Sequence, residues 1–280
     1  MVGGCSVAGP EHEPSRTPTS EPAAIATPQS VIPTDQAEPR ITVSTPSPSA
    51  VPTPSTPAVL QAFALNLYEA GDFVPQYTFD WCVAASIQMA YNLVEPERRT
   101  ARADQEQLWE LARSQSSNSF GGANPWGWAA VLNDVGIGPY ELVSIPDYDE
   151  ALRVAAAAIV ATQRPVGLVM WRGRHAWVMS GFESVGDPAA DAGFLVTGVR
   201  VLDPLYPHGS GVWGPSPEPN SLLGPAELAK QFVIRDSRRW SSGLSPGYLL
   251  VLPVPAEVSA GQQRRSQWPP FEGEPRTSSS

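Results

Sequence analysis

Residues of four types, at three separate places in the sequence, have the chemistry that acyl transfer requires. Cys82 offers a thiol nucleophile, His175 a base that can hold the thiol proton, and Asp203 a carboxylate that can orient the imidazole. Gln76, six positions before the cysteine, carries an amide that can donate to a developing oxyanion, as can the backbone N–H of Cys82. We interpret these four residues as a candidate catalytic set for attack on a carbonyl group.

The segment from residue 76 to residue 94 predicts how the thiol is positioned. Its apolar residues recur at helical spacing, at Ala85, Met89 and Leu93. We expect a largely buried helix that begins near Cys82, with Thr78 or Asp80 as its cap. Unpaired N–H groups and the helix dipole at such a start favour the thiolate, which is the reactive form. The alternative is structural, because a free cysteine usually serves as a small buried hydrophobic residue.

From Pro165 onward the pattern predicts strands. Four apolar runs have strand length, at residues 166–171, 175–182, 194–203 and 248–254, and Arg172-Gly173-Arg174 fits a tight turn between the first two. His175 opens the second run and Asp203 closes the third, so an antiparallel sheet would bring them together. The alternatives are that His175 is a hydrogen-bonded core histidine and that Asp203 merely ends a strand.

Other helices and two tryptophans complete the predicted domain. Helices are expected at residues 104–114, from residue 126 to near Gly136, and at 148–163. Asn124 is the expected cap of the second of these, and Asp147 or Asp149 that of the third. Trp126 and Trp128 are predicted to form part of a substrate groove wall, with core packing as the alternative. His208 is expected in a solvated loop.

Composition divides the chain sharply. Residues 10–58 are rich in Pro, Ser and Thr with almost no aromatic side chains, so we expect a disordered tether. We place one folded domain at residues 59–255, which holds eight of the nine tryptophans, and a disordered tail at 256–280.

The first nine residues resemble a bacterial lipobox, with Val2-Gly3-Gly4 before Cys5. The apolar segment that normally precedes such a motif is absent, so either the true start lies upstream of Met1 or the resemblance is accidental. We expect the first, with Cys5 lipidated and the protein secreted or anchored at the bacterial cell surface. A Cys5–Cys82 disulfide is not expected, because it would block the nucleophile.

The overall charge and the absent motifs exclude several functions. The net charge is −10 and Lys230 is the only lysine, so no basic stripe is available for nucleic acid. No apolar run has the length of a transmembrane helix. Metal-binding and phosphate-binding motifs are also missing from the sequence. We expect a monomer that acts on a peptide or protein without a cofactor or metal.

The same residues resemble those of the papain-like cysteine peptidases, most closely the compact bacterial C39-like and AvrRpt2-like branches. Trp81-Cys82-Val83-Ala84-Ala85-Ser86 looks like their bacterial WC-x-A-A-S motif. The resemblance implies that Gln76 helps to form the oxyanion hole, that His175 is the base and that Asp203 orients it. It also implies an α+β fold in which an N-terminal helical part, carrying the nucleophile helix, packs against a C-terminal antiparallel half-barrel sheet.

The sequence therefore predicts an exported cysteine peptidase that hydrolyses peptide bonds through Cys82, His175 and Asp203. One alternative keeps this triad in a cell-wall amidase or acyltransferase, a class that usually lacks a glutamine six residues before the cysteine. Another is a papain-like module without turnover, which would hold a peptide or glycan.

Overall fold

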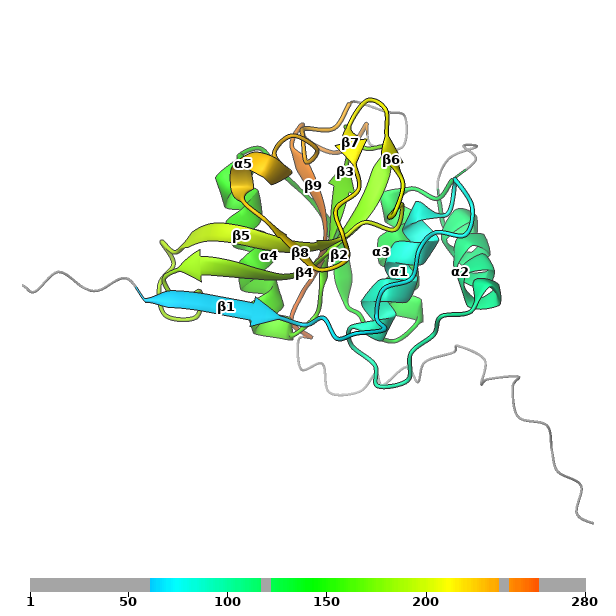
Figure 1. Ribbon diagram of the computed structural model, residues 1–280, viewed down its shortest axis with the longest axis horizontal. Helices are drawn as coiled ribbons and strands as arrows, with labels where there is room; N and C mark the ends of the chain where they lie inside the picture. The colour runs from blue at the N-terminus through cyan, green and yellow to red at the C-terminus, as the bar shows by residue number, and fades with distance from the viewer. Residues whose placement is uncertain (1–60, 117–121, 237–241, 257–280) are drawn as a thin grey trace, which may run out of the picture. The chain divides into compact units, whose positions relative to one another are not determined.

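The strands of the protein join segments that lie far apart in the sequence. The computed structural model describes residues 61–116, 122–236 and 242–256. The strands in these ranges are β1 (Ala62–Asn66), β2 (Tyr140–Ile145), β3 (Val166–Met170), β4 (His175–Val185), β5 (Leu195–Leu202), β6 (Gly209–Ser210), β7 (Gly214–Pro215), β8 (Ser221–Leu223) and β9 (Tyr248–Pro253). Seven of them form one sheet (Figure 1). Six follow in the order β2-β9-β3-β4-β5-β8, and the seventh, β1, pairs with the second half of β4. Every pairing is antiparallel, including the separate β6–β7 hairpin.

The helices begin close to where their sequence signals predict. They are α1 (Cys82–Asn92), α2 (Arg102–Ser114), α3 (Pro125–Asp134), α4 (Tyr148–Thr162) and the short α5 (Pro225–Leu228). The Asn124 side chain accepts hydrogen bonds from two backbone N–H groups of α3, and Asp147 accepts one at the start of α4, so both predicted caps are confirmed. The predicted cap of α1 is wrong. Trp81 occupies that position, and no side chain of the described residues caps the helix.

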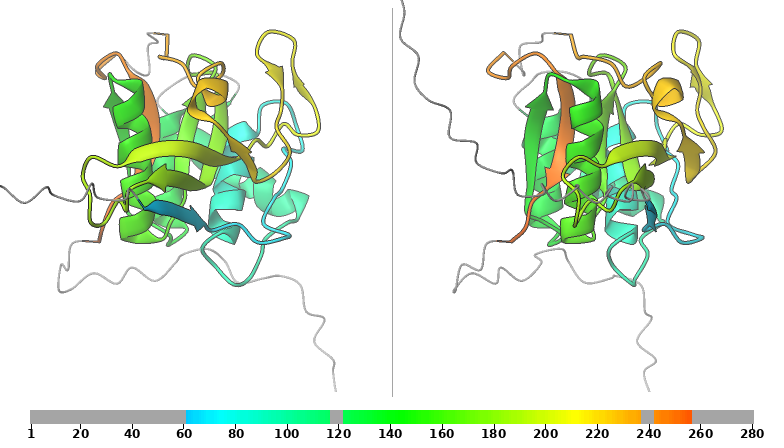
Figure 2. Two further views of the ribbon diagram at one scale, coloured as in Figure 1. Left: turned by 60° about the vertical axis from the view of Figure 1, so that its left-hand side comes forward. Right: turned by 90° about the vertical axis from the view of Figure 1, so that its left-hand side faces the viewer.

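Apolar side chains fill both faces of the sheet. Along β4, Ala176 and Val178 point into a cluster that includes α1, α2 and α3, whereas Trp177 and Met179 point into a second cluster beneath α4. Figure 2 shows α4 and the first three helices on opposite sides of the strands. The predicted combination of helices with an antiparallel sheet is therefore confirmed, and α4 covers the face that α1 does not.

The packing of α1 on the sheet positions the two halves of the candidate site. Both α1 and β4 contribute to the first cluster, and the N-terminal end of α1 lies near the end of β4 at which His175 stands. Within the described residues, none of the helices is long and apolar enough to cross a bilayer.

Candidate active site

Cys82 is the first residue of α1. Its side chain is partly exposed and forms no disulfide. One turn further along the helix, the buried Ser86 hydroxyl donates a hydrogen bond of 3.4 Å to the backbone oxygen of Ala176. Because Ala176 directly follows His175, this bond links the nucleophile helix to the strand that carries the base.

His175 is placed by a tight turn between β3 and β4. It pairs with Met170 in the antiparallel register, and the backbone N–H groups of Gly173 and Arg174 both donate to the Met170 oxygen, at 2.9 and 3.0 Å. The predicted turn and the predicted start of the strand are both confirmed. The histidine is only 6% exposed, so its ring is shielded from bulk water.

Asp203 follows β5 directly and meets the His175 ring. The pairing of Val178 with Leu202 brings the end of β5 beside the start of β4. The distance from His175 Nε2 to Asp203 Oδ1 is 2.7 Å, and the same oxygen accepts a 2.9 Å hydrogen bond from the Leu205 N–H. Because a carboxylate only accepts, Nε2 carries the hydrogen, and Nδ1 is left to face Cys82.

The surroundings of His175 favour its protonated form. Burial alone lowers the pKa of the ring, but hydrogen bonds to Asp203 and Cys82, with the charges of both groups, raise it from 6.5 to about 9. The thiol therefore lies within hydrogen-bonding reach of the imidazole. A Cys–His pair in this arrangement can exist as a thiolate beside an imidazolium, the form that attacks carbonyl carbon.

Gln76 lies in the loop that leads to Cys82. Its backbone N–H donates a 2.8 Å hydrogen bond to the oxygen of Pro204, which adjoins Asp203. Its side-chain Nε2 donates to the backbone oxygens of Thr78 and Phe79, at 3.0 and 2.9 Å. Both amide hydrogens are thus directed at this loop, and a role in an oxyanion hole requires one of them to turn toward the substrate.

Two buried glutamines that the sequence analysis missed fix the backbone around Gln76. The Gln105 side chain of α2 accepts from the N–H of Tyr77 at 2.8 Å and donates to the oxygen of Pro75 at 3.1 Å. It also donates to Gln88 of the nucleophile helix at 2.9 Å, and both glutamines are fully buried. Gln105 therefore holds the residues on either side of Gln76 against α1.

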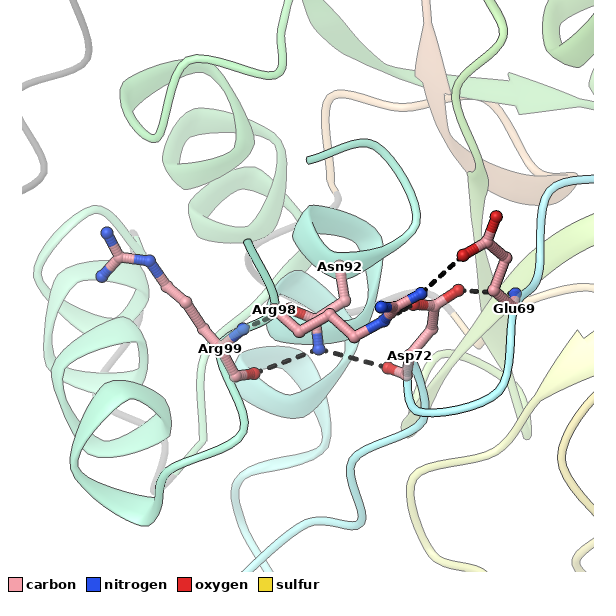
Figure 3. Close-up of polar contacts among 5 residues, drawn as sticks. All are labelled: Glu69, Asp72, Asn92, Arg98 and Arg99. Atoms are coloured by element: carbon pink, nitrogen blue, oxygen red, sulfur yellow. Dashed lines mark hydrogen bonds and ion pairs between the residues drawn. The ribbon is translucent and has the colours of Figure 1, made fainter. Parts of the chain in front are cut away.

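A second polar cluster holds the chain upstream of this loop (Figure 3). Arg98 bonds to the carboxylates of Asp72 and Glu69, at 2.6 and 2.7 Å. The buried Asn92 side chain, at the end of α1, donates to the backbone oxygens of Asp72 and Arg99. These contacts anchor the segment that enters the site, while the reacting groups lie at the opposite end of α1.

The two predicted groove tryptophans have different environments. Trp126 is 41% exposed, and its place in a groove wall stays a prediction. Trp128 is 1% exposed, and its ring packs so closely over Gly167 that a Cβ there would lie 2.6 Å from it. The prediction that Trp128 lines a substrate groove is therefore wrong, because its ring fills the apolar cluster between the sheet and helices α1 to α3.

The other predicted positions lie in a surface loop or outside the described residues. His208 lies in the exposed loop before β6, as expected. Cys5, the tether and the tail lie outside the described residues. Among the residues that the structure describes, no group of three or more His, Cys, Asp and Glu side chains could hold a metal ion.

The described residues thus bring together a partly exposed thiol at a helix start, a buried imidazole and a fully buried carboxylate. This arrangement can generate a nucleophile and return a proton to a leaving group. Comparison with known protein families, with curated proteins and with solved structures found no match to this chain.

Proposed function

We propose that this protein is a papain-like cysteine peptidase of the C39-like or AvrRpt2-like type, which hydrolyses peptide bonds. The observation that carries the proposal is the position of His175, whose ring bonds to Asp203 through Nε2 and lies within reach of Cys82. A Cys at a helix start, packed against an antiparallel sheet whose strand opens with the His, supports the papain-like assignment.

The proposed reaction has two steps. The Cys82 thiolate attacks the peptide carbonyl carbon, and the backbone N–H of Cys82, with Gln76, stabilises the oxyanion. His175 then gives its proton to the leaving amine as the C–N bond breaks, which leaves a thioester on Cys82. In the second step His175 takes a proton from water, the hydroxide attacks the thioester, and the acid product leaves as the thiol is restored.

The proposed oligomeric state, substrate class and location rest on the sequence. We propose a monomer that acts on a peptide or protein substrate, at or beyond the bacterial cell surface, with a lipid on Cys5 as the anchor. The proposed chemistry uses groups of the protein itself and water.

A second candidate is a cell-wall amidase or acyltransferase with the same triad. It is favoured by the hydrogen bonds of Gln76 Nε2 to Thr78 and Phe79, because a glutamine engaged in its own loop is not free to donate to an oxyanion. Assays of peptide and cell-wall amide substrates, each with Gln76→Ala, separate the two. A large loss in the variant supports the peptidase mechanism.

The test is alkylation of Cys82 by iodoacetamide between pH 4 and pH 9, read by mass spectrometry on the full chain and on His175→Ala. Rapid labelling at pH 5 to 6, where an unactivated thiol is protonated, is expected in the wild type and should be lost in the variant. Labelling that rises only at alkaline pH and is the same in both proteins would reject the thiolate–imidazolium pair. A binding module without turnover would then be the better interpretation.

A further inference from the structure

Trp171 lies flat against the ring of the proposed base. The centroids of the Trp171 and His175 rings are 4.0 Å apart and their planes differ by 21°, so the two rings are stacked. Trp171 is only 9% exposed and belongs to the apolar cluster beneath α4. One face of the imidazole is therefore covered by an indole ring.

The backbone that presents Trp171 has an uncommon conformation. Trp171 and Arg172 have φ angles of +55° and +58°, followed by Gly173 at +86°, so three consecutive residues are left-handed. Residues with a Cβ are sterically disfavoured in this region, and such strain persists only where surrounding contacts impose it.

The contacts that impose this conformation come chiefly from Gln231. The Trp171 N–H donates to the backbone oxygen of Gln231 at 3.0 Å, and its indole Nε1 donates to the side-chain Oε1 of the same residue at 2.8 Å. On the other side of the turn, the N–H of Asp236 donates to the oxygen of Arg172 at 3.1 Å. The indole is therefore fixed in plane and in position.

We propose that Trp171 is a positioning residue for His175, whose indole face keeps the imidazole aligned between Asp203 and Cys82 and stabilises its protonated form. This inference rests on the proposed function of the site. The negative face of an indole attracts a cation above it, and the attraction is stronger where water is excluded. A stacked ring also resists the rotation that would break the bond from Nε2 to Asp203.

Other charged groups near the ring have separate roles. Cys82 approaches from α1 and Asp203 from the end of β5. On the turn itself, Arg172 and Arg174 form ion pairs with Asp236, at 3.8 and 3.3 Å. A substitution of Trp171 therefore removes the stacking contact on the imidazole ring but removes no charged group.

The experiment uses the full chain with His12 and His208 replaced by Gln, so that His175 is the only histidine. Trp171→Leu removes the aromatic face, and Trp171→Phe keeps one. Trp213→Leu makes the same change at a partly buried tryptophan that packs against the cluster beneath α4. Two quantities are measured, the titration midpoint of His175 by NMR and the ratio of Cys82 alkylation rates at pH 6 and pH 9.5. Trp171→Leu should lower the midpoint by about one pH unit and the rate ratio several-fold. The other two variants should stay close to the parent chain.

Equal values for Trp171→Leu and Trp213→Leu in both measurements would overturn the proposal. If Trp171→Leu does not fold, 5-fluorotryptophan at all nine tryptophans weakens the indole face and keeps its shape. This should lower the midpoint in the parent chain and leave it unchanged in Trp171→Phe, and no shift in either overturns the proposal. Absence of His175-dependent alkylation in the wild type would instead count against the proposed function, while the titration would still test the stack.

Discussion

The helical layer and the sheet hold their halves of the site by different means. On the sheet, the backbone register of β3, β4 and β5 brings His175 and Asp203 together, and each residue stands at a strand end. In the helical layer, the loop before Cys82 has no strand to pair with. Buried side-chain amides of Gln105 and Gln88 hold it instead.

This difference has consequences for mutation. A register that is held by many backbone bonds tolerates the loss of one side chain. The loop depends more on single side chains, because Gln105 alone bonds to the residues on both sides of Gln76. Substitutions of residues that do not react should therefore harm the site more from the helical side than from the sheet side.

The largest effect is expected at the nucleophile itself, where the two halves meet. Cys82→Ala should lower peptide hydrolysis by a factor on the order of 10⁴ or more, because no other group can form the thioester. The fold should stay intact, since the side chain is partly exposed. Hydrolysis of a fluorogenic peptide library and thermal unfolding of the variant measure the two quantities. Full activity in this variant would end the proposed mechanism.

The next largest effect tests the helical side. Gln105→Leu removes the partner of Tyr77 N–H and Pro75 oxygen, so the loop that carries Gln76 loses its position. Peptide hydrolysis should fall by about 10²-fold, the scale of a lost oxyanion donor. The alkylation rate of Cys82 should stay near the wild-type value, because alkylation needs no oxyanion hole.

A matched control lies on the same helix. Gln107→Leu makes the same chemical change two residues further along, where the side chain is partly exposed. Its hydrolysis should stay close to wild type. If both variants lose activity equally, or if Gln105→Leu also loses alkylation, the glutamine supports the whole helix pair and does not specifically hold the loop.

The sequence predicted the sheet side of the site better than the helical side, for a physical reason. Strands β3 and β9 are continuous apolar runs and β4 and β5 are mostly apolar, so a histidine or aspartate at the end of such a run is visible in the sequence. Antiparallel pairing then places the two ends together. The caps Asn124 and Asp147 were also predictable, because their capping hydrogen bonds are formed within their own helices.

What the sequence could not give depends on partners far along the chain. Gln105 is an ordinary helix residue until the fold brings Pro75 and Tyr77 to it. The burial of Trp128 depends on Gly167, which leaves room for its ring. Strand β2 contains Glu141 and Ser144 and is formed by full-length pairing with β9. No local pattern carries these relationships.

A smaller effect is expected from the charge of His175 on stability. Its folded-state pKa of about 9 lies above the unfolded value of 6.5, so its contribution to stability is complete below pH 6.5 and is lost as pH rises toward 9. In a Cys82→Ala background, where the Asp203 bond remains, His175→Gln should cost about 1–2 kcal/mol more at pH 6 than at pH 9.5. Urea unfolding at both pH values measures this difference. A cost that is independent of pH would mean that folding does not shift the pKa of the ring.

The smallest effect on catalysis is expected at Asp203, and it tests how much the sheet side depends on charge. The Leu205 N–H and His175 Nε2 both point at Oδ1, so Asp203→Asn should keep an amide oxygen there and preserve the ring tautomer. Losing the negative charge removes one support of the imidazolium, so hydrolysis should fall by about tenfold, far less than in Cys82→Ala. Arg200→Ala, which breaks a partly exposed cross-strand pair with Glu183, should leave hydrolysis unchanged, because the register rests on backbone bonds. A loss in Asp203→Asn equal to that in Cys82→Ala would show that the carboxylate charge, and not the register, holds the sheet half of the site.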